Sequence, residues 1–231
     1  RRIYRSALCV VSDEQSFYGI EMNLDENYNT STIKFGRGEV HRLNFEDNTT
    51  ELVAELDVSP AIVKQEGSSI ESMMRFIGAA LSGNNLYLVF EQPALVDSSV
   101  FFANEADIER FALRYELGNP TPQRIPLAGG AKLIAAQGST ILYSALTADS
   151  NDVQICMLDT TTDQRTVLQT ISGKEGRPAH FAYDIPNAKL YYNLNGQVFE
   201  MDATGKTTLV ALFPFQDIQG LFLLPGNQIG A

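Results

Sequence analysis

The stretch RPAHFAYDIPNAKLYYNLNGQVFEMDATGKTTLVALF, residues Arg177–Phe213, decides the fold class. It contains four short apolar runs separated by turn-forming residues: His180–Asp184, Lys189–Leu194, Gln197–Asp202 and Thr207–Phe213. Asn195-Gly196, between the second and third runs, favours a tight hairpin, because both residues tolerate the positive φ of a type I′ turn. Four such strands within roughly 40 residues are typical of one blade of a β-propeller.

The same order of runs and turns recurs along the rest of the chain. The predicted blades cover approximately 5–56, 75–127, 132–171 and 177–213, and a partial copy covers 218–231. A tyrosine lies in the second run of each full copy: Tyr18, Tyr87, Tyr143 and Tyr191. A β-sandwich also alternates apolar and polar residues, but it need not repeat one order of runs and turns four times. The sequence therefore predicts an all-β fold, a β-propeller with four recognisable four-stranded blades plus the first strand of a fifth.

Three segments of the last full copy resemble a blade of the TolB-like and YWTD-like propellers: Leu190–Asn193, Gly196–Asp202 and Gly205–Thr208. The likeness extends moderately to the third copy and in outline to the first two. Those families typically carry six blades, whereas this sequence shows four full copies. The Tyr-Trp-Thr-Asp string is also missing, since the chain has no tryptophan. The resemblance thus implies an architecture and no particular activity.

Two long polar segments interrupt the runs. Leu24–Thr32 and Gln92–Asp107 are longer than ordinary hairpin connections, so we expect both to project from the blades. Within the second segment, Phe101 and Phe102 are expected either to pack down as a lid or to stand exposed as an anchor for a partner, and packing is the favoured alternative. Asp57–Ser72 is expected to connect two blades.

Ser59-Pro60 is compatible with the start of a short helix in that connector, because proline is favoured in the first turn of a helix.

The count of four copies plus one strand predicts a ring that does not close conventionally within this chain. A sheet edge would then be open for pairing with another segment unless Gln219–Ile229 caps it. Alternatively, the chain is one piece of a longer protein.

The composition excludes some classes of function. The 231 residues include 17 basic and 28 acidic side chains, a formal net charge of −11, which argues against nucleic acid as a partner. No apolar run approaches the roughly 20 residues that span a bilayer. Ala7–Val11 is too short for the apolar core of a signal peptide.

The cysteines and histidines do not form a zinc-binding pattern. Cys9 and Cys156 lie in apolar runs of different copies, so we expect free thiols rather than a disulfide. His41 and His180 do not have the spacing of zinc ligands relative to these cysteines. The sequence therefore predicts no metal site and no cofactor.

Enzymatic motifs are sparse. We find no Gly-x-Ser-x-Gly elbow and no P-loop in the sequence. Asp13, Asp184 and Asp217 lie near the ends of first strands, where a propeller glycosidase or lactonase could use them as acid, base or metal ligand. Aspartates at strand ends are more commonly turn formers. The repeated tyrosines are expected to fill the space between blades, with each hydroxyl bonded to a neighbouring backbone group, rather than to form a ligand platform.

Basic residues recur where the innermost strands begin. Arg5, Arg75, Lys132 and His180 lie at or next to this position in successive copies, and Arg177 precedes His180. In propellers, the innermost strands start at the face that commonly binds ligands. The sequence therefore predicts a ring of cations suited to a carboxylate, a phosphate or an acidic side chain. The alternative is that these are ordinary solvated residues at strand starts.

Together these features favour a non-enzymatic binding or scaffolding module of a secreted, periplasmic or cell-surface protein. Its expected partner is a protein or a small anionic ligand, bound on the propeller face. The alternative function is a carbohydrate-active or lactone-cleaving hydrolase that acts at the central channel.

Overall fold

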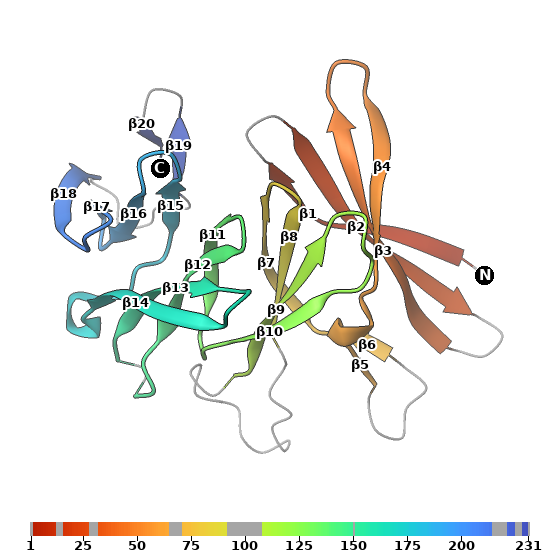
Figure 1. Ribbon diagram of the computed structural model, residues 1–231, viewed down its shortest axis with the longest axis horizontal. Coiled ribbons are helices and arrows are strands. Elements are labelled where there is room, and N and C mark those ends of the chain that lie inside the picture. Colours follow the sequence, from red (N-terminus) through yellow and green to blue (C-terminus); the bar gives the residue numbers. More distant parts are fainter. Residues whose placement is uncertain are drawn as a thin grey trace. The chain divides into compact units, whose positions relative to one another are not determined.

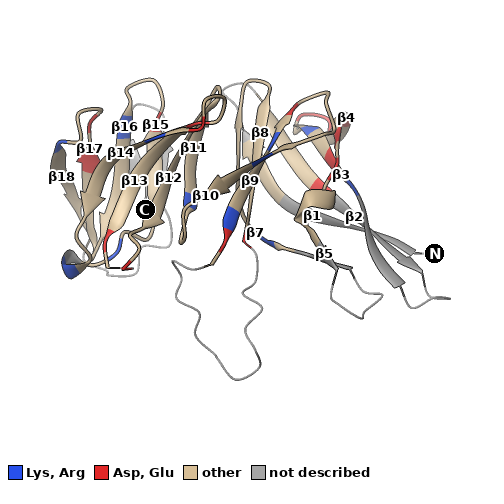
Figure 2. Ribbon diagram, turned by 60° about the horizontal axis from the view of Figure 1, so that its bottom comes forward, with Lys and Arg blue, Asp and Glu red and all other residues tan. Residues whose placement is uncertain are grey.

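The computed structural model describes residues 2–12, 16–27, 32–64, 71–91, 108–149, 151–213, 221–224 and 228–230. These residues fall into two compact units, and the division lies between Leu127 and Ala128. Figure 1 and Figure 2 show that both units consist almost entirely of strands. We refer to them as unit 1 and unit 2, and describe each by itself.

Unit 1 contains two four-stranded antiparallel sheets in which each strand pairs with the next along the chain. The strands of the first sheet are β1 (Arg2–Ser12), β2 (Phe17–Asn27), β3 (Thr32–Asn44) and β4 (Thr49–Leu56). Those of the second are β7 (Arg75–Ser82), β8 (Asn85–Glu91), β9 (Arg110–Glu116) and β10 (Gln123–Leu127). Between the sheets come the 3₁₀ helix η1 (Ser59–Ala61) and the strands β5 (Ile62–Lys64) and β6 (Glu71–Met73).

Unit 2 repeats this arrangement. Its first sheet contains β11 (Lys132–Gln137), β12 (Thr140–Leu146), β13 (Val153–Asp159) and β14 (Gln164–Ile171). After the 3₁₀ helix η3 (Gly173–Glu175), the second sheet contains β15 (Phe181–Asp184), β16 (Lys189–Leu194), β17 (Gln197–Met201) and β18 (Thr207–Leu212). The strands β19 (Phe222–Leu224) and β20 (Gln228–Gly230) follow as a two-stranded sheet.

These sheets confirm the predicted all-β fold with four propeller-type blades. The innermost strands are neighbours, as a propeller requires: β1 lies beside β7 in unit 1, and β11 beside β15 and β15 beside β19 in unit 2. Where one strand of a fifth blade was predicted, the described residues form a hairpin of two strands. The expectation that the ring does not close conventionally concerns both units together and stays a prediction.

The turn that decided the fold class has the predicted backbone conformation. Asn195 and Gly196 have φ values of 51° and 78°, and they join β16 to β17. Two successive positive φ values match the right-handed twist of the flanking strands. The prediction of a type I′-like hairpin at this position is therefore confirmed.

A repeated irregularity supports the equivalence of the blades. The pairing of the fourth strand with the third skips one residue in three of the four sheets: Val53, Leu168 and Val210. A bulge of this kind bends the strand and increases its twist. Recurrence at the same place in the blade is not expected of unrelated hairpins.

The core of each unit lies between its two blades. In unit 1, Tyr18 and Ile20 of the first blade pack with Leu86 and Leu88 of the second. In unit 2, Leu142 of the third blade packs with residues of the fourth that include Leu190, Tyr192 and Leu194. Burial of these apolar surfaces, at about 25 cal/mol per Å² of area, is the main force that holds the blades of a unit together.

The core corrects the predicted register of the third tyrosine. Tyr18 faces the following blade, but in the third blade the residue that does so is Leu142, so Tyr143 points to the opposite face. Side chains alternate along a strand, and a shift of one residue therefore changes the face. The bulge between the third and fourth strands gives the same alignment. Leu142, Tyr18 and Tyr191 occupy the same position relative to this bulge in their blades, whereas Tyr143 does not.

The predicted connections are only partly correct. Leu24–Thr32 was expected to be a projecting loop, but β2 continues to Asn27 and β3 begins at Thr32, so its described residues belong to the two strands, and its projection from the blade stays a prediction. Asp57–Ser72 does connect two blades, and Pro60 lies in the first turn of η1 as expected. The pairing of β5 with β6 was not predicted. Gln92–Asp107, with Phe101 and Phe102, lies outside the described residues.

Candidate anion-binding site

Two of the predicted basic residues line one small cavity in unit 2. Lys132 is the first residue of β11, and Arg177 precedes β15. The cavity has a volume of about 80 Å³, and the described residues around it are Gly130, Lys132, Ser144, Ala145, Leu146, Val153, Arg177 and Pro178. This lining includes two cationic side chains and no carboxylate. We call it the cationic recess.

Local backbone geometry shapes the wall of this recess. Gly130 has a φ of 67°, a conformation that other residues rarely adopt, and Leu146 donates its backbone N–H to the carbonyl of Gly129 over 3.1 Å. A Cβ on Gly130 would lie 2.6 Å from Cγ of Leu146. Glycine is therefore required for the chain to pass this close to β12. Ser144 lies directly opposite Lys132 and adds a hydroxyl to the lining.

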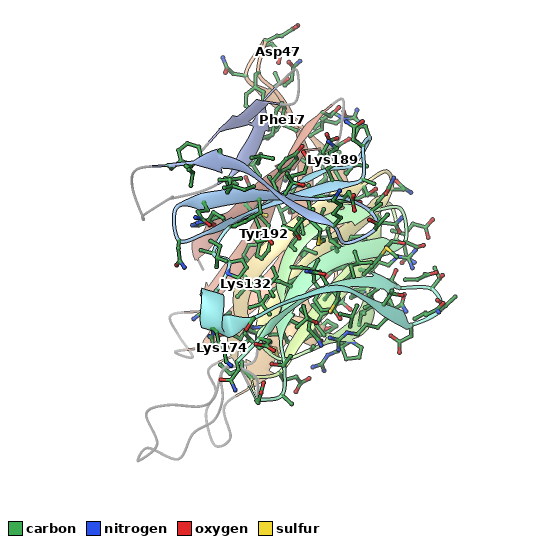
Figure 3. All side chains as sticks on the ribbon, turned by 90° about the vertical axis from the view of Figure 1, so that its left-hand side faces the viewer. Phe17, Asp47, Lys132, Lys174, Lys189 and Tyr192 are labelled. Atoms are coloured by element: carbon green, nitrogen blue, oxygen red, sulfur yellow. The ribbon has the colours of Figure 1, made fainter. Side chains whose placement is uncertain are left out.

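A larger and more open recess of about 610 Å³ lies next to the first. Its described lining residues are Asp149, Asn151, Asp152, Ser172, Gly173, Lys174 and Arg177, so Arg177 borders both recesses. Lys132 and Lys174 lie on the same side of unit 2 in Figure 3. The Thr147 hydroxyl bonds to Asp149 and lowers the pKa of that carboxyl, which keeps it ionised. Two carboxylates therefore make the larger recess less suited to an anion than the cationic recess.

Segments distant along the chain build the larger recess. Gly173, in η3, donates its backbone N–H to Oδ1 of Asp152 over 3.0 Å, which fixes the segment after β14 against the loop before β13. The Thr147 hydroxyl accepts a hydrogen bond from the backbone N–H of Asp152 in the same loop. Arg177 therefore lies on a segment whose beginning, at Gly173, is fixed to this loop.

The other predicted basic residues lie in different surroundings. Arg75 forms an ion pair with Glu91, with Nε 3.4 Å from Oε1, so it already has a carboxylate partner in its own sheet. His180 donates its backbone N–H to Oδ1 of Asn193 over 2.8 Å, and its carbonyl accepts the Asn193 N–H over 3.2 Å. Arg5 lies opposite Asn23 in the pairing of β1 with β2. The structure thus brings Lys132 and Arg177 to one cavity, and a ring of all five residues stays a prediction.

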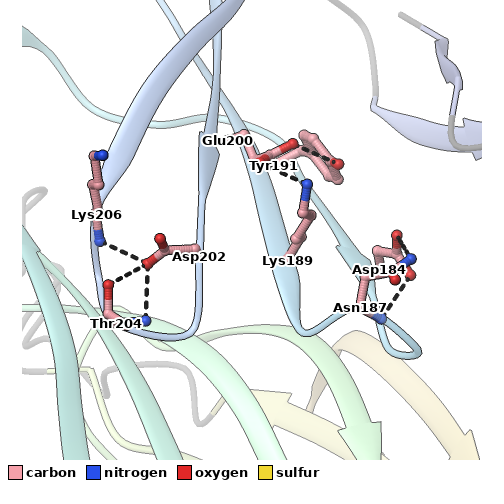
Figure 4. A network of polar contacts seen from close by, with 8 residues as sticks. All are labelled: Asp184, Asn187, Lys189, Tyr191, Glu200, Asp202, Thr204 and Lys206. Carbon is pink, nitrogen blue, oxygen red and sulfur yellow. Dashed lines mark hydrogen bonds and ion pairs between the residues drawn. The ribbon is translucent and has the colours of Figure 1, made fainter.

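The candidate catalytic carboxylates gain no support from Asp184. This residue is buried and accepts hydrogen bonds from the backbone N–H and the side-chain amide of Asn187, over 3.3 and 2.8 Å (Figure 4). It stabilises the turn after β15, as most aspartates at strand ends do. Asp13 and Asp217 lie outside the described residues.

The hydroxyl of one repeated tyrosine has a different partner from the predicted backbone group. Tyr191 donates to Oε2 of Glu200 over 2.9 Å, and Nζ of Lys189 lies 2.9 Å from Oε1 of the same carboxylate (Figure 4). These contacts lower the pKa of Glu200, with Lys189 the largest cause. The Glu200 carboxylate is thus already bonded to two residues of its own blade.

Sequence reasoning missed a second group of residues, in unit 1. Glu21, Glu39 and His41 each offer one ligand atom, and these atoms all lie within 4.8 Å of one another. Glu39 and His41 alternate along β3 and so share one face, which was a signal in the sequence. Glu21 joins them only through the pairing of β2 with β3, because it lies directly opposite Glu39.

Comparisons with known proteins show the fold alone. No family model matches the chain, and no curated protein matches it. Among solved structures, an oligogalacturonate lyase in complex with manganese has a TM-score of 0.51 and 11% identity, over 88% of this chain and 52% of the lyase. The chain thus spans about half the length of the lyase.

Two further structures are similar at a lower level. The nidogen/laminin complex has a TM-score of 0.49 at 12% identity, over 96% of this chain and 70% of the matched chain. A gluconolactonase from Xanthomonas campestris has a TM-score of 0.48 at 11% identity, over 96% of this chain and 81% of that enzyme.

In the described part of the chain, no helix has the length and apolar character needed to cross a membrane.

Proposed function

We propose that the chain is a non-enzymatic binding module that holds a carboxylate or phosphate group in the cationic recess. The group belongs to an acidic protein partner or to a small anionic ligand. The observation that carries this proposal is that Lys132, at the start of an innermost strand, and Arg177, in the segment before the next one, line one cavity without a carboxylate among its described residues. The extracellular or periplasmic setting expected from the sequence is part of this proposal.

The physical basis is the contrast between the recess and the rest of the molecule. The chain carries a net charge of −11, so two cations that line one cavity make the potential there more positive than over most of the surface. Arg177 can bind a carboxylate or phosphate with two parallel N–H donors, whereas Lys132 acts as a compact point charge. Leu146 and Val153 supply apolar wall, where charges interact more strongly than in open water.

The test is a titration with two probes, inorganic phosphate and a glutamate-rich peptide. Binding is measured by calorimetry or NMR shifts in the wild type and in Arg177→Ala and Lys132→Ala. Loss of one charged hydrogen-bonding group is expected to weaken binding by roughly 1.5–3 kcal/mol. Added salt is expected to reproduce part of that loss, because the recess is accessible to solvent.

Lys189→Ala serves as the matched control, since Lys189 is a lysine of unit 2 that already pairs with Glu200. The control is expected to bind both probes like the wild type. Equal binding by all four proteins, or equal loss in the control, would contradict the proposal. Turnover of a lactone or an oligosaccharide without such binding would favour the alternative hydrolase.

A further inference from the structure

The face of the first blade that points away from the second blade carries an unusual row of side chains. Ile20 and Val40 lie in the core shared with the second blade, so the alternating residues Glu21, Glu39 and His41 point to the other face. Glu21 on β2 lies directly opposite Glu39 on β3. His41 is the next residue of β3 on the same face as Glu39. It lies opposite Gly19, which contributes no side chain.

The row continues with a third glutamate. Glu55 on β4 lies directly opposite Glu39, so three carboxylates follow one another across three strands. Like charges directly opposite each other destabilise a sheet unless a cation separates them. Glu55 has such a cation, because Nη1 of Arg37 lies 2.5 Å from its Oε2. The other two glutamates need a different source of positive charge.

His41 contacts Glu39 only. Its Nε2 lies 2.9 Å from Oε2 of Glu39, and both side chains are largely buried. In contrast, Oε2 of Glu21 is shielded from solvent and has no hydrogen-bond partner among the described residues. A buried carboxylate oxygen without a partner costs free energy, because it has lost its hydration and gained no bond.

We propose that Glu21, Glu39 and His41 bind a divalent transition-metal ion of the Zn²⁺ or Mn²⁺ class. The ligand atoms lie within 4.8 Å of one another, so small side-chain rotations bring all three to the mutual spacing of about 3.5 Å that ligands have around one Zn²⁺ at bond lengths of about 2.0–2.2 Å. The ion gives the orphaned oxygen of Glu21 its partner and neutralises the two facing carboxylates. A metal-bound Nε2 of His41 carries no proton, so the ion replaces any proton that joins this nitrogen to Glu39.

The donor set determines the class of ion. An imidazole with two carboxylates suits Zn²⁺ and Mn²⁺, whereas Ca²⁺ and Mg²⁺ prefer shells made wholly of oxygen. Three protein ligands leave at least one position for water, as in sites where a metal meets solvent. Gly19 keeps the position beside His41 free of a side chain.

The experiment is a calorimetric titration of the intact chain with Zn²⁺, and with Mg²⁺ for comparison. We expect one equivalent of Zn²⁺ to bind and to raise the melting temperature, since an ion that binds only the folded state stabilises it. Glu21→Gln and His41→Gln are each expected to reduce the Zn²⁺ affinity by more than about tenfold, the loss seen when even a residue behind a ligand is replaced.

Glu55→Gln is the matched control, because Glu55 belongs to the same row but pairs with Arg37. It is expected to keep the Zn²⁺ affinity of the wild type. Circular dichroism of each variant without metal establishes that the variant is folded. Absence of Zn²⁺ binding, unchanged binding by Glu21→Gln, or an equal loss in Glu55→Gln would overturn the proposal and leave an internal His41–Glu39 pair.

Discussion

Arg110 donates from Nε to Oε2 of Glu91 over 2.8 Å, and the two residues lie directly opposite each other on β9 and β8. Both are buried, with 4% and 6% of their surface exposed. Arg75 approaches the other oxygen of the same carboxylate from β7, but 71% of its side chain is exposed. One glutamate is therefore shared by a buried and an exposed arginine.

This asymmetry predicts very different effects of two similar substitutions. Arg110→Ala leaves the Glu91 charge buried without its main partner and is expected to lower the free energy of unfolding by roughly 3–5 kcal/mol. Arg75→Ala removes an exposed pair and is expected to cost about 0–1 kcal/mol. Denaturant unfolding of the two variants and the wild type measures both effects. Comparable losses in the two variants would show that burial does not determine the strength of this pair.

The segment beside the proposed anion site gives a second prediction. A Cβ on Gly173 would overlap the backbone carbonyl of Asn151, so Gly173→Ala forces η3 away from the loop before β13. The hydrogen bond from Gly173 to Asp152 is then lost. We expect lower stability and weaker phosphate binding, because Arg177 follows on the displaced segment.

Gly138→Ala is a suitable control, because a Cβ there meets nothing within 4 Å, although its φ of 58°, unlike the φ of Gly173, is positive. It adds backbone strain without the overlap. The two variants are compared by thermal unfolding and by phosphate titration. If Gly138→Ala loses as much phosphate binding as Gly173→Ala, the position of η3 does not govern the site.

Much of the fold could be predicted because its signals are local. The strand β16 has the predicted bounds, since it is an apolar run between Ala188 and Asn195, two turn residues with positive φ. Tyr143 shows where this reasoning fails. A tyrosine fits either face of a buried strand, and only the packing of Leu142 against the fourth blade fixes which face it occupies.

The candidate sites depended on contacts between strands that the sequence does not encode locally. Glu21 meets Glu39 because of the register between β2 and β3, which includes an irregularity between Met22 and Leu24. The sequence suggested a loop there, so the register was hidden. The partner of Arg75 was hidden for a similar reason, since Glu91 lies at the far end of the next strand.

The Asn195-Gly196 turn gives a third prediction. Gly196→Val places a β-branched side chain at a φ of 78° and is expected to lower the free energy of unfolding by about 1–2 kcal/mol. Asn195→Gly keeps the permitted conformation and is expected to change it by less. Thermal unfolding of both variants checks the difference. A Gly196→Val protein as stable as the wild type would show that this turn relaxes without strain.

The last prediction concerns stability at high pH. Burial raises the pKa of Tyr143 and of Tyr191 from 10.0 to about 12, and in Tyr191 the hydrogen bond to Glu200 adds to the shift. Burial likewise raises the pKa of the Cys9 thiol to about 11 and raises that of Tyr115. Each of these groups therefore stays protonated in the folded chain at a pH where it ionises in the unfolded chain.

The sign of the effect follows from proton linkage. Below the unfolded pKa values, of about 8.5 for cysteine and 10 for tyrosine, both states hold these protons and stability does not depend on them. As the pH rises towards 12, the unfolded state releases protons that the folded state retains, so the free energy of unfolding falls. Urea unfolding between about pH 8 and pH 12 measures this loss, and the phenolate absorbance follows tyrosine ionisation directly. Tyr143→Phe removes one titrating group and is expected to make the fall shallower by about one proton per molecule. An unchanged slope in Tyr143→Phe would mean that this hydroxyl ionises equally readily in the folded and unfolded chain.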